Sequence, residues 1–220
     1  MDAISEAAAE RLCLALPAGE RERAARFRQP ADRVRFIVAR AALRRILSNT
    51  LGEPFGAIAL VTSPTGKPQL TSRSPQFNLA HSGSVVLIAI ADEAAVGVDV
   101  ERVRDLAARD EIASRFMHAG ERAEIARLTG AQAELAFFRC WTRKEAVAKA
   151  LGLGLSLPLH RYRVTCASAQ DARVLSIDED EAGAGSWFLA GLSPHTGHVG
   201  AVAWRDAPLT LRRRTLELAR

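Results

Sequence analysis

Residues 77–101 read FNLAHSGSVVLIAIADEAAVGVDVE, and this stretch decides the fold. It contains three short runs of strand-forming residues, 77–80, 85–91 and 96–101. The first two runs are separated by HSGS at positions 81–84, a turn sequence that predicts a β-hairpin. The third run alternates apolar and polar residues strictly, which predicts a strand with one buried face.

Apolar residues at helical spacing lie on both sides of these strands. They predict one helix over residues 32–51 and a long helix over about 131–151, each followed by a glycine. Further β-rich segments lie between residues 161 and 204. The pattern predicts an α+β protein with two pseudo-symmetric α+β halves, residues 1–104 and 105–220.

The composition is that of an ordinary globular protein. Of the 220 residues, 48% are hydrophobic and 25% charged, which excludes a disordered or fibrous chain. The longest apolar run is too short to cross a membrane, and the first residues do not resemble a signal peptide, so we expect a cytoplasmic protein. The cysteines at 13, 140 and 166 suit neither a disulfide framework nor a metal knuckle, and we expect buried thiols.

Several common catalytic motifs are absent from the sequence. Gly66-Lys67 lacks the other residues of a P-loop, and Gly152-Leu153-Gly154 lacks the third glycine of a dinucleotide-binding loop. Neither G-x-S-x-G nor H-E-x-x-H occurs. These absences exclude the common nucleotide-binding loops, the α/β-hydrolase elbow and the zinc-protease helix.

Positive charge is concentrated near the N-terminus. Residues 11–45 contain ten arginines and three acidic residues, whereas the whole chain has a net charge of only +5. Arginine suits bidentate recognition of phosphate, so this segment favours an anionic partner. The alternative is a solvated helix face in a protein that uses arginine at nearly every basic position, and the charge pattern leaves both open.

The strand predicted over residues 96–101 places two carboxylates on one face. Alternation puts the three valines on one side and Gly97, Asp99 and Glu101 on the other. The two carboxylates then stand about 7 Å apart at the backbone, close enough for both to bind one hard cation such as Mg²⁺. A strand with one wet face is the simpler alternative for a single D-x-E pattern.

Four residues of the long predicted helix form a stripe. Phe137, Trp141, Glu145 and Lys149 recur every four residues and therefore lie along one side of the helix. The stripe is apolar in its first half and ionic in its second, as expected for a helix that passes from the core into a polar cleft. Core packing of the aromatic pair, with a surface ion pair of Glu145 and Lys149, would give the same pattern.

His81 lies in the predicted hairpin turn. Its imidazole and the neighbouring backbone N–H groups could hold an anion there. A histidine in a turn is, however, more often incidental, and the other histidines show no spacing typical of metal ligands.

Four motifs follow one another along the chain. They are Gly66-Lys67-Pro68, Phe77-Asn78-Leu79-Ala80-His81-Ser82, Gly97-Val98-Asp99-Val100-Glu101 and Trp141-Thr142-Arg143-Lys144-Glu145-Ala146-x-x-Lys149, with Gly152-Leu153-Gly154-Leu155 behind them. In this order and spacing they resemble the signature set of the Sfp-type 4′-phosphopantetheinyl transferases over about residues 20–165. The resemblance implies the phosphopantetheinyl transferase-like fold, with the active site between the two halves.

The resemblance also implies an activity. Members of this family transfer 4′-phosphopantetheine from coenzyme A to a serine of an apo acyl or peptidyl carrier protein, release adenosine 3′,5′-bisphosphate and depend on Mg²⁺. By resemblance, Asp99, Glu101 and Glu145 ligate the Mg²⁺, and Lys149 contacts the pyrophosphate. Glu145 is also a candidate for the base that accepts the serine proton, directly or through water.

Contacts with coenzyme A follow from the same resemblance. His81 and Ser82 would help to hold its phosphates, and Lys67 would make a further contact with a phosphate or the adenosine. The basic positions that bind the 3′-phosphate in relatives correspond here to Arg23, Arg33 and Arg35. Two features depart from the family pattern: Ala80 replaces the serine that usually precedes the histidine, and residues 1–16 look helical where relatives tend to have a strand.

Two other functions stay open. A basic nucleic-acid-binding protein would use the arginine-rich segment and residues 212–214, but it would leave the acidic strand and the ionic helix without a purpose. A non-catalytic relative that binds coenzyme A would not need three metal-binding carboxylates. We therefore expect an enzyme whose partners are coenzyme A and an apo carrier protein, without nucleic acid or membrane, acting as a monomer.

Overall fold

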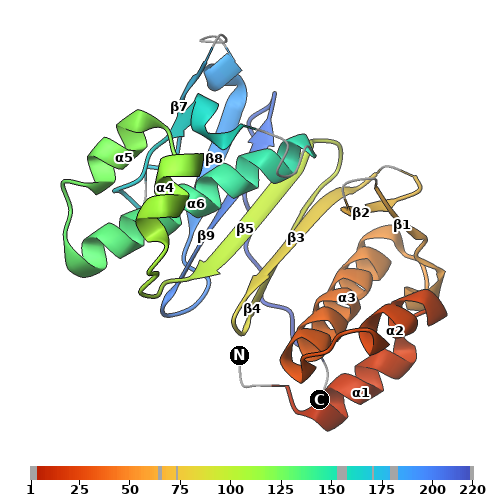
Figure 1. Cartoon of the computed structure of the whole chain (residues 1–220). Helices are drawn as coiled ribbons and strands as arrows, with labels where there is room; N and C mark the ends of the chain where they lie inside the picture. The colour runs from red at the N-terminus through yellow and green to blue at the C-terminus, as the bar shows by residue number, and fades with distance from the viewer. Residues whose placement is uncertain are drawn as a thin grey trace. The chain divides into compact units, whose positions relative to one another are not determined.

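The computed structural model describes residues 4–63, 66–72, 74–152, 158–169, 171–178 and 183–218. The chain divides into two compact units: Met1–Leu60 with Thr210–Arg220, here called the helical unit, and Val61–Leu209, here called the sheet unit. Helices and strands occur together, which confirms the predicted α+β class (Figure 1). None of the helices in the described ranges has the length and apolar character that a membrane crossing requires.

The helical unit is made of α1 (Glu6–Ala15), α2 (Ala18–Ala25), α3 (Pro30–Leu51) and the 3₁₀ helix η1 (Phe55–Ala57). Helix α3 begins at a proline, which suits a first helical turn, and ends at Gly52, whose φ of 70° is left-handed. This confirms the helix predicted over residues 32–51, and α1 confirms the helical character predicted for the N-terminus. The core of this unit contains Cys13, Leu16, Ala24, Ile37 and Ala41.

In the rest of the chain, a run of strands is followed by a run of helices and then by further strands. The strands are β1 (Leu60–Thr62), β2 (Pro68–Leu70), β3 (Gln76–Ser82), β4 (Val85–Ala91), β5 (Val96–Arg102), β6 (Tyr162–Val164), β7 (Val174–Ile177), β8 (Trp187–Leu192) and β9 (His198–Arg205). The helices are α4 (Arg109–Phe116), α5 (Ala119–Ile125), α6 (Gly130–Leu151) and the 3₁₀ helices η3 (Leu159–Arg161) and η4 (Gly183–Ser186). The strands pair as β1-β2, β3-β4, β5-β9-β8 and β6-β7.

The predicted hairpin is present as β3 and β4. Their register pairs Ser82 with Val85, so the turn consists of Gly83 and Ser84 alone, and Gly83 has a φ of 56°. His81 and Ser82 are therefore the last residues of a strand. The prediction that His81 lies in the turn was wrong, because the tight two-residue turn lets the strand continue further than the polar sequence suggested.

Strand β5 has two different faces, as its alternation predicted. Val96, Val98 and Val100 join a cluster that includes Ala80 of β3 and Trp204 of β9. No backbone ladder joins β3 to β5; instead the side-chain oxygen of Asn78 accepts a hydrogen bond from the backbone N–H of Val98 at 2.9 Å.

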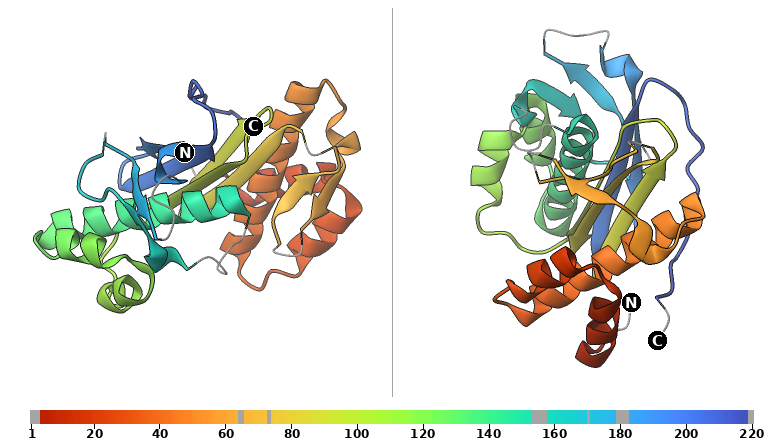
Figure 2. Two further views of the ribbon diagram at one scale, coloured as in Figure 1. Left: turned by 90° about the horizontal axis from the view of Figure 1, so that it is seen from above. Right: turned by 90° about the vertical axis from the view of Figure 1, so that its right-hand side faces the viewer.

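The other face of β5 is covered by α6, which runs across β5 and β9 (Figures 1 and 2). Small residues line this face: Gly97 of β5 pairs with Ala203 of β9, and Asp99 pairs with Ala201. A Cβ atom at Gly97 would lie only 2.0 Å from the carbonyl oxygen of Ala146 in α6. The helix therefore packs backbone against backbone on the strand that carries Asp99.

All three cysteines are buried free thiols, as predicted. Those at 140 and 166 belong to the core cluster between α6 and the sheet. The predicted halves 1–104 and 105–220 are defined by a similar order of elements, whereas the helical and sheet units are defined by compactness. The two units therefore do not test the pseudo-symmetric halves, which stay a prediction.

Candidate active site

Asp99 lies on the face of β5 that α6 covers. Its side chain is 8% exposed, and one of its oxygens, Oδ1, accepts a hydrogen bond from Nζ of Lys149 at 2.6 Å. Lys149 lies in the last turn of α6, fifty residues away in the sequence. The structure thus joins two of the predicted site residues directly.

Burial dominates the electrostatics of Asp99. It raises the pKa of this carboxyl to about 7, although the Lys149 ammonium works against it; Glu145 and Glu101 raise the pKa further by repulsion. The second carboxyl oxygen, Oδ2, is buried and has no hydrogen-bond partner among the described residues. An unsatisfied buried acceptor costs about 1–3 kcal/mol. A cation bound to Oδ2 would remove this cost and stabilise the Asp99 carboxylate.

Glu145 lies one helical turn before Lys149 and shares its side of α6. Burial raises the pKa of Glu145, Lys149 lowers it, and Glu101 raises it again. Glu101 lies two residues beyond Asp99 on β5 and is half-buried. The three predicted carboxylates therefore lie near enough to repel one another. Lys149 is the counter-charge of Asp99 and Glu145, whereas Glu101 pairs with Arg104 at 3.5 Å.

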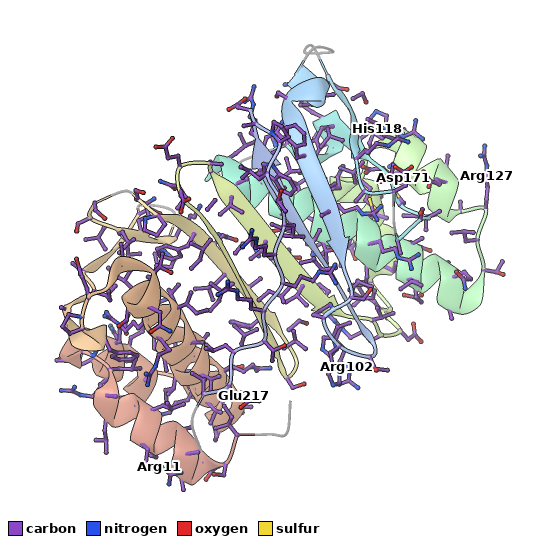
Figure 3. The ribbon with its side chains drawn as sticks, turned by 180° about the vertical axis from the view of Figure 1, so that it is seen from behind. Arg11, Arg102, His118, Arg127, Asp171 and Glu217 are labelled. Carbon is purple, nitrogen blue, oxygen red and sulfur yellow. The ribbon has the colours of Figure 1, made fainter. Side chains whose placement is uncertain are left out.

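Ser82 connects the hairpin to this group. Its hydroxyl donates to Oε2 of Glu101 at 2.8 Å and accepts from the backbone N–H of Arg102 at 3.0 Å. Arg102 ends β5 at the edge of the sheet (Figure 3). Ser82 thus holds Glu101 in place, while His81 beside it is exposed at the end of β3.

Lys67 approaches the same end of α6. Its Nζ donates to the carbonyl oxygen of Lys149 at 3.2 Å, and burial lowers the pKa of Lys67. Of the predicted site residues, Lys67 thus meets Lys149 at the end of α6, and Lys149 in turn meets Asp99 on β5.

The donor chemistry of this group fits a hard divalent cation. Carboxylate oxygens are the ligands that Mg²⁺ prefers, and Oδ2 of Asp99 lacks a partner. Over the described ranges, no three His, Cys, Asp or Glu side chains already converge as a metal cage. In this structure the Lys149 ammonium is bonded to the Asp99 carboxylate. Binding of a cation by all three carboxylates therefore requires the side chains of Glu101 and Glu145 to turn toward Asp99.

The predicted phosphate-binding arginines lie in the helical unit. Arg33 of α3 forms a forked ion pair with Glu10 of α1, and Arg35 pairs with Asp32 within α3. Arg23 of α2 stacks over the ring of Phe36, 5.4 Å from its centroid. It also lines a shallow pocket of about 430 Å³ together with Arg26 and Phe27.

Part of the arginine surplus is therefore structural. Arg44 is 4% exposed and donates through Nε to Glu20 at 2.8 Å and through Nη1 to the carbonyl oxygen of Ile58 at 2.9 Å. Arg40 lies 3.8 Å from the same glutamate. The sequence left two interpretations of the arginines open, an anionic partner or a solvated helix face. Arg40 and Arg44 fit neither, because both belong to an ion-pair network with Glu20 inside the helical unit.

Sequence reasoning missed a second ionic group, around Lys144. This lysine is completely buried and bonds to Glu121 of α5, which is also completely buried. A signal was available: Phe137, Cys140, Lys144 and Val147 recur at helical spacing, which places the lysine on the apolar side of α6.

Comparison with protein families finds two matches that together cover most of the chain. Residues 5–93 match the family described as 4′-phosphopantetheinyl transferase, N-terminal. Residues 95–203 match the 4′-phosphopantetheinyl transferase superfamily, and this segment includes β5 and α6.

Individual relatives agree with the family matches. The 4′-phosphopantetheinyl transferase HetI of Nostoc sp. is 33% identical over 196 residues, which are 87% of this chain and 79% of the relative. The 4′-phosphopantetheinyl transferase psf-1 of Bacillus pumilus is 35% identical over 146 residues, or 65% of this chain and 60% of the relative. A Synechocystis sp. protein, slr0495, whose assignment to the same activity is provisional, is 35% identical over 144 residues, which are 64% of this chain and 58% of that protein.

Proposed function

Because this chain belongs to the 4′-phosphopantetheinyl transferase superfamily, we propose that it transfers 4′-phosphopantetheine from coenzyme A to a serine hydroxyl of an apo carrier protein. Adenosine 3′,5′-bisphosphate is the other product. The observation that carries the proposal is the meeting of Asp99 on β5 with Lys149 on α6 at 2.6 Å, with Glu101 and Glu145 close enough to act on the Asp99 charge.

Asp99, Glu101 and Glu145 are proposed to hold a Mg²⁺ ion. When bound, the ion supplies positive charge that neutralises the pyrophosphate as it is attacked. Lys149, whose side chain is 28% exposed, can leave Asp99 and bind a pyrophosphate oxygen. Glu145 accepts the serine proton, directly or through water, and its raised pKa makes it a better base than an exposed glutamate.

The remaining predicted residues are proposed to bind coenzyme A. Lys67 lies at the end of α6, where its Nζ is bonded to the carbonyl oxygen of Lys149, and offers a positive charge. His81 is exposed near the end of β3 and offers the polar nitrogens of its ring. Ser82 serves first to hold Glu101, because its hydroxyl is already bonded to that carboxylate. The 3′-phosphate is assigned to Arg23, Arg33 and Arg35; the latter two must exchange their ion pairs with Glu10 and Asp32 for the phosphate.

Mass spectrometry tests the proposal. Apo carrier proteins of the fatty-acid, polyketide and peptide-synthetase types are incubated with the protein, coenzyme A and Mg²⁺, and at least one is expected to gain the mass of phosphopantetheine. An Asp99→Asn variant is expected to be inactive, and the exposed Glu93→Gln on the same unit serves as the matched control. Binding of coenzyme A without modification of any carrier would instead indicate a non-catalytic relative.

The sequence also predicted a cytoplasmic monomer that binds no nucleic acid, and these points stay predictions. Fluorescence anisotropy with a labelled duplex checks the last one, since a nucleic-acid-binding protein would show tight and strongly salt-dependent binding.

A further inference from the structure

We propose that the buried pair of Lys144 and Glu121 is a positioning device for the active site: it fixes the rotation of α6 about its axis, so that Glu145 and Lys149 face Asp99. The inference rests on the proposed function and adds two positioning residues to it. Lys144 stands next to Glu145 in the motif, yet its side chain points into the protein, and among the described residues its Nζ bonds to groups inside the sheet unit.

Lys144 is held on several sides at once. Its Nζ donates to Oε1 of Glu121 at 2.8 Å and to the carbonyl oxygen of Tyr162 at 2.6 Å, and it lies 4.4 Å from the centroid of the Tyr162 ring. The Tyr162 hydroxyl donates in return to the carbonyl oxygen of Lys144 at 2.7 Å. Both the side chain and the backbone of this residue are thereby tied to the start of β6.

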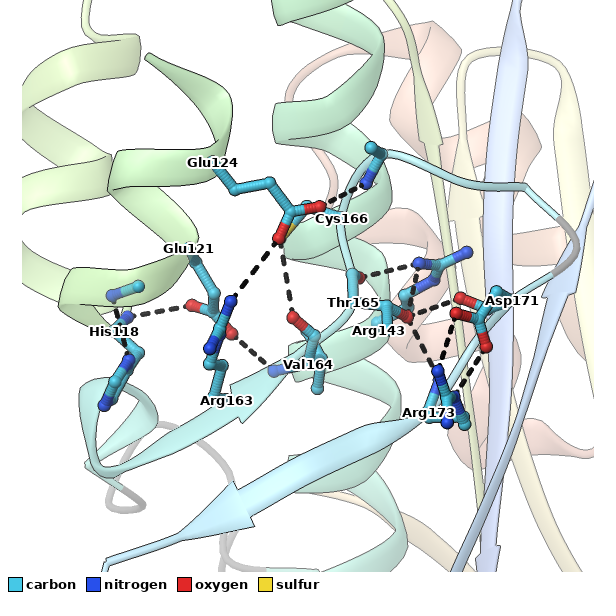
Figure 4. Close-up of polar contacts among 12 residues, drawn as sticks. His118, Glu121, Glu124, Arg143, Arg163, Val164, Thr165, Cys166, Asp171 and Arg173 are labelled. Carbon is cyan, nitrogen blue, oxygen red and sulfur yellow. Dashed lines mark hydrogen bonds and ion pairs between the residues drawn. The ribbon is translucent and has the colours of Figure 1, made fainter. Parts of the chain in front are cut away.

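Glu121 is anchored equally firmly. Oε2 accepts from the backbone N–H of His118, which closes a capping box at the start of α5, and Oε1 accepts from the backbone N–H of Val164 in β6 at 2.7 Å (Figure 4). A buried charge pair fixes geometry in this way only when its remaining hydrogen-bonding sites are satisfied, and here they are. The pair therefore joins α5, α6 and β6 at one point.

The preceding residue adds a second anchor. Arg143 is 1% exposed, and its guanidinium donates to the carbonyl oxygen of Thr165 at 2.6 Å (Figure 4). It also donates to the carbonyl oxygen of Ser168 at 2.5 Å. Arg143 and Lys144 thus hold one side of α6, while Ala146 packs against Gly97 of β5. Successive residues of a helix are about 100° apart, so Glu145 points between these two fixed sides.

The geometry gives the size of the effect. A helix with side chains has a radius of about 5–6 Å, so a rotation of about 20° moves a carboxylate at its surface by about 2 Å. A misplacement of about 1 Å can lower a rate about a hundredfold. Loss of the pair is therefore expected to lower kcat by about ten- to a hundredfold, without removing a group that touches coenzyme A.

Steady-state kinetics of Glu121→Gln, Lys144→Met and the double variant test the inference. We expect each single variant to lower kcat and leave the KM for coenzyme A nearly unchanged, and the double variant to be no worse than the more impaired single one. Met117→Ala is the matched control, because it removes a buried side chain from the core cluster between α6 and the sheet. It should lower stability without lowering kcat.

Two kinetic outcomes would overturn the inference. In one, Lys144→Met raises the KM for coenzyme A while Glu121→Gln has no effect, which would make Lys144 a substrate ligand. In the other, kcat falls in Met117→Ala as much as in Glu121→Gln, which would make the pair a source of stability alone.

A second readout does not need activity. Trp141 lies on α6 and stacks on Phe137, with the ring of Phe116 5.7 Å away, so its surroundings report rotation of the helix. In ¹⁹F NMR of protein labelled with 5-fluorotryptophan, Glu121→Gln is expected to shift the Trp141 resonance. An unmoved resonance would refute the positioning role even in a protein that modifies no carrier, whereas an inactive wild type with a shifted resonance would refute only the proposed function.

Discussion

Replacing Gly97 by alanine is expected to push α6 away from β5. The added Cβ atom would lie 2.0 Å from the carbonyl oxygen of Ala146 and 2.4 Å from the backbone nitrogen of Ala150. Ordinary contact begins at 3.4 Å, so the helix must retreat by about 1.4 Å. Both nearest atoms belong to the backbone of a helix, and no rotamer change can relieve the clash.

The cost in stability follows from the packing. Overpacking of a core typically costs 1–3 kcal/mol, and we expect the upper end, about 3 kcal/mol, because the clash is between two backbones. In a chain of this size that lowers Tm by about 6–12 °C. Denaturant unfolding should show the midpoint falling with an unchanged m-value.

The same shift should impair the active site more than the fold. Glu145 and Lys149 move with α6 while Asp99 stays on β5, and a displacement of about 1 Å can cost about a hundredfold in rate. Phosphopantetheine transfer is therefore measured under conditions where circular dichroism shows the variant folded. Gly185→Ala is the matched control, because nothing lies within 4 Å of a Cβ atom at that position.

A contrary result would be plain. The contrary result is a Gly97→Ala variant that keeps full activity and whose free energy of unfolding lies within about 0.5 kcal/mol of the wild-type value, as for Gly185→Ala. In that case α6 does not rest on β5 as described, and the account of the site built on that contact fails.

Two further predictions concern buried polar groups. Burial raises the pKa of Tyr162 well above 10.0, so the neutral phenol stabilises the fold; this contribution is complete below about pH 10 and is lost as the pH rises further. In an alkaline titration, the ultraviolet absorbance of the single tyrosine should change to that of tyrosinate at the same pH at which near-ultraviolet circular dichroism shows unfolding. Ionisation of Tyr162 in the folded protein would contradict its burial. Arg44→Met should destabilise the protein by about 3 kcal/mol in denaturant unfolding, because it leaves Glu20 without its nearest counter-charge, whereas the exposed Arg45→Met should change little; equal effects would refute the role of that ion pair.

The sequence predicted the fold class and the main elements well. The alternation of residues 96–101 predicted which side chains of β5 lie on each face, and the helical spacing predicted α3 and α6 nearly to their ends. These features depend on neighbours two to four residues apart, so their pattern is visible in the chain itself. The position of His81 was missed because a tight turn and a slightly longer one have similar compositions.

The sequence by itself also indicated which residues could bear the chemistry, through the order and spacing of motifs that resemble those of the family, and these roles stay predictions. Only the tertiary structure decided how they are paired. Asp99 with Lys149, and Lys144 with Glu121, are contacts across 50 and 23 residues of chain. The first pair depends on how closely α6 can approach β5. That distance is set by the absence of a side chain at Gly97, and its effect appears only when the two backbones are packed together.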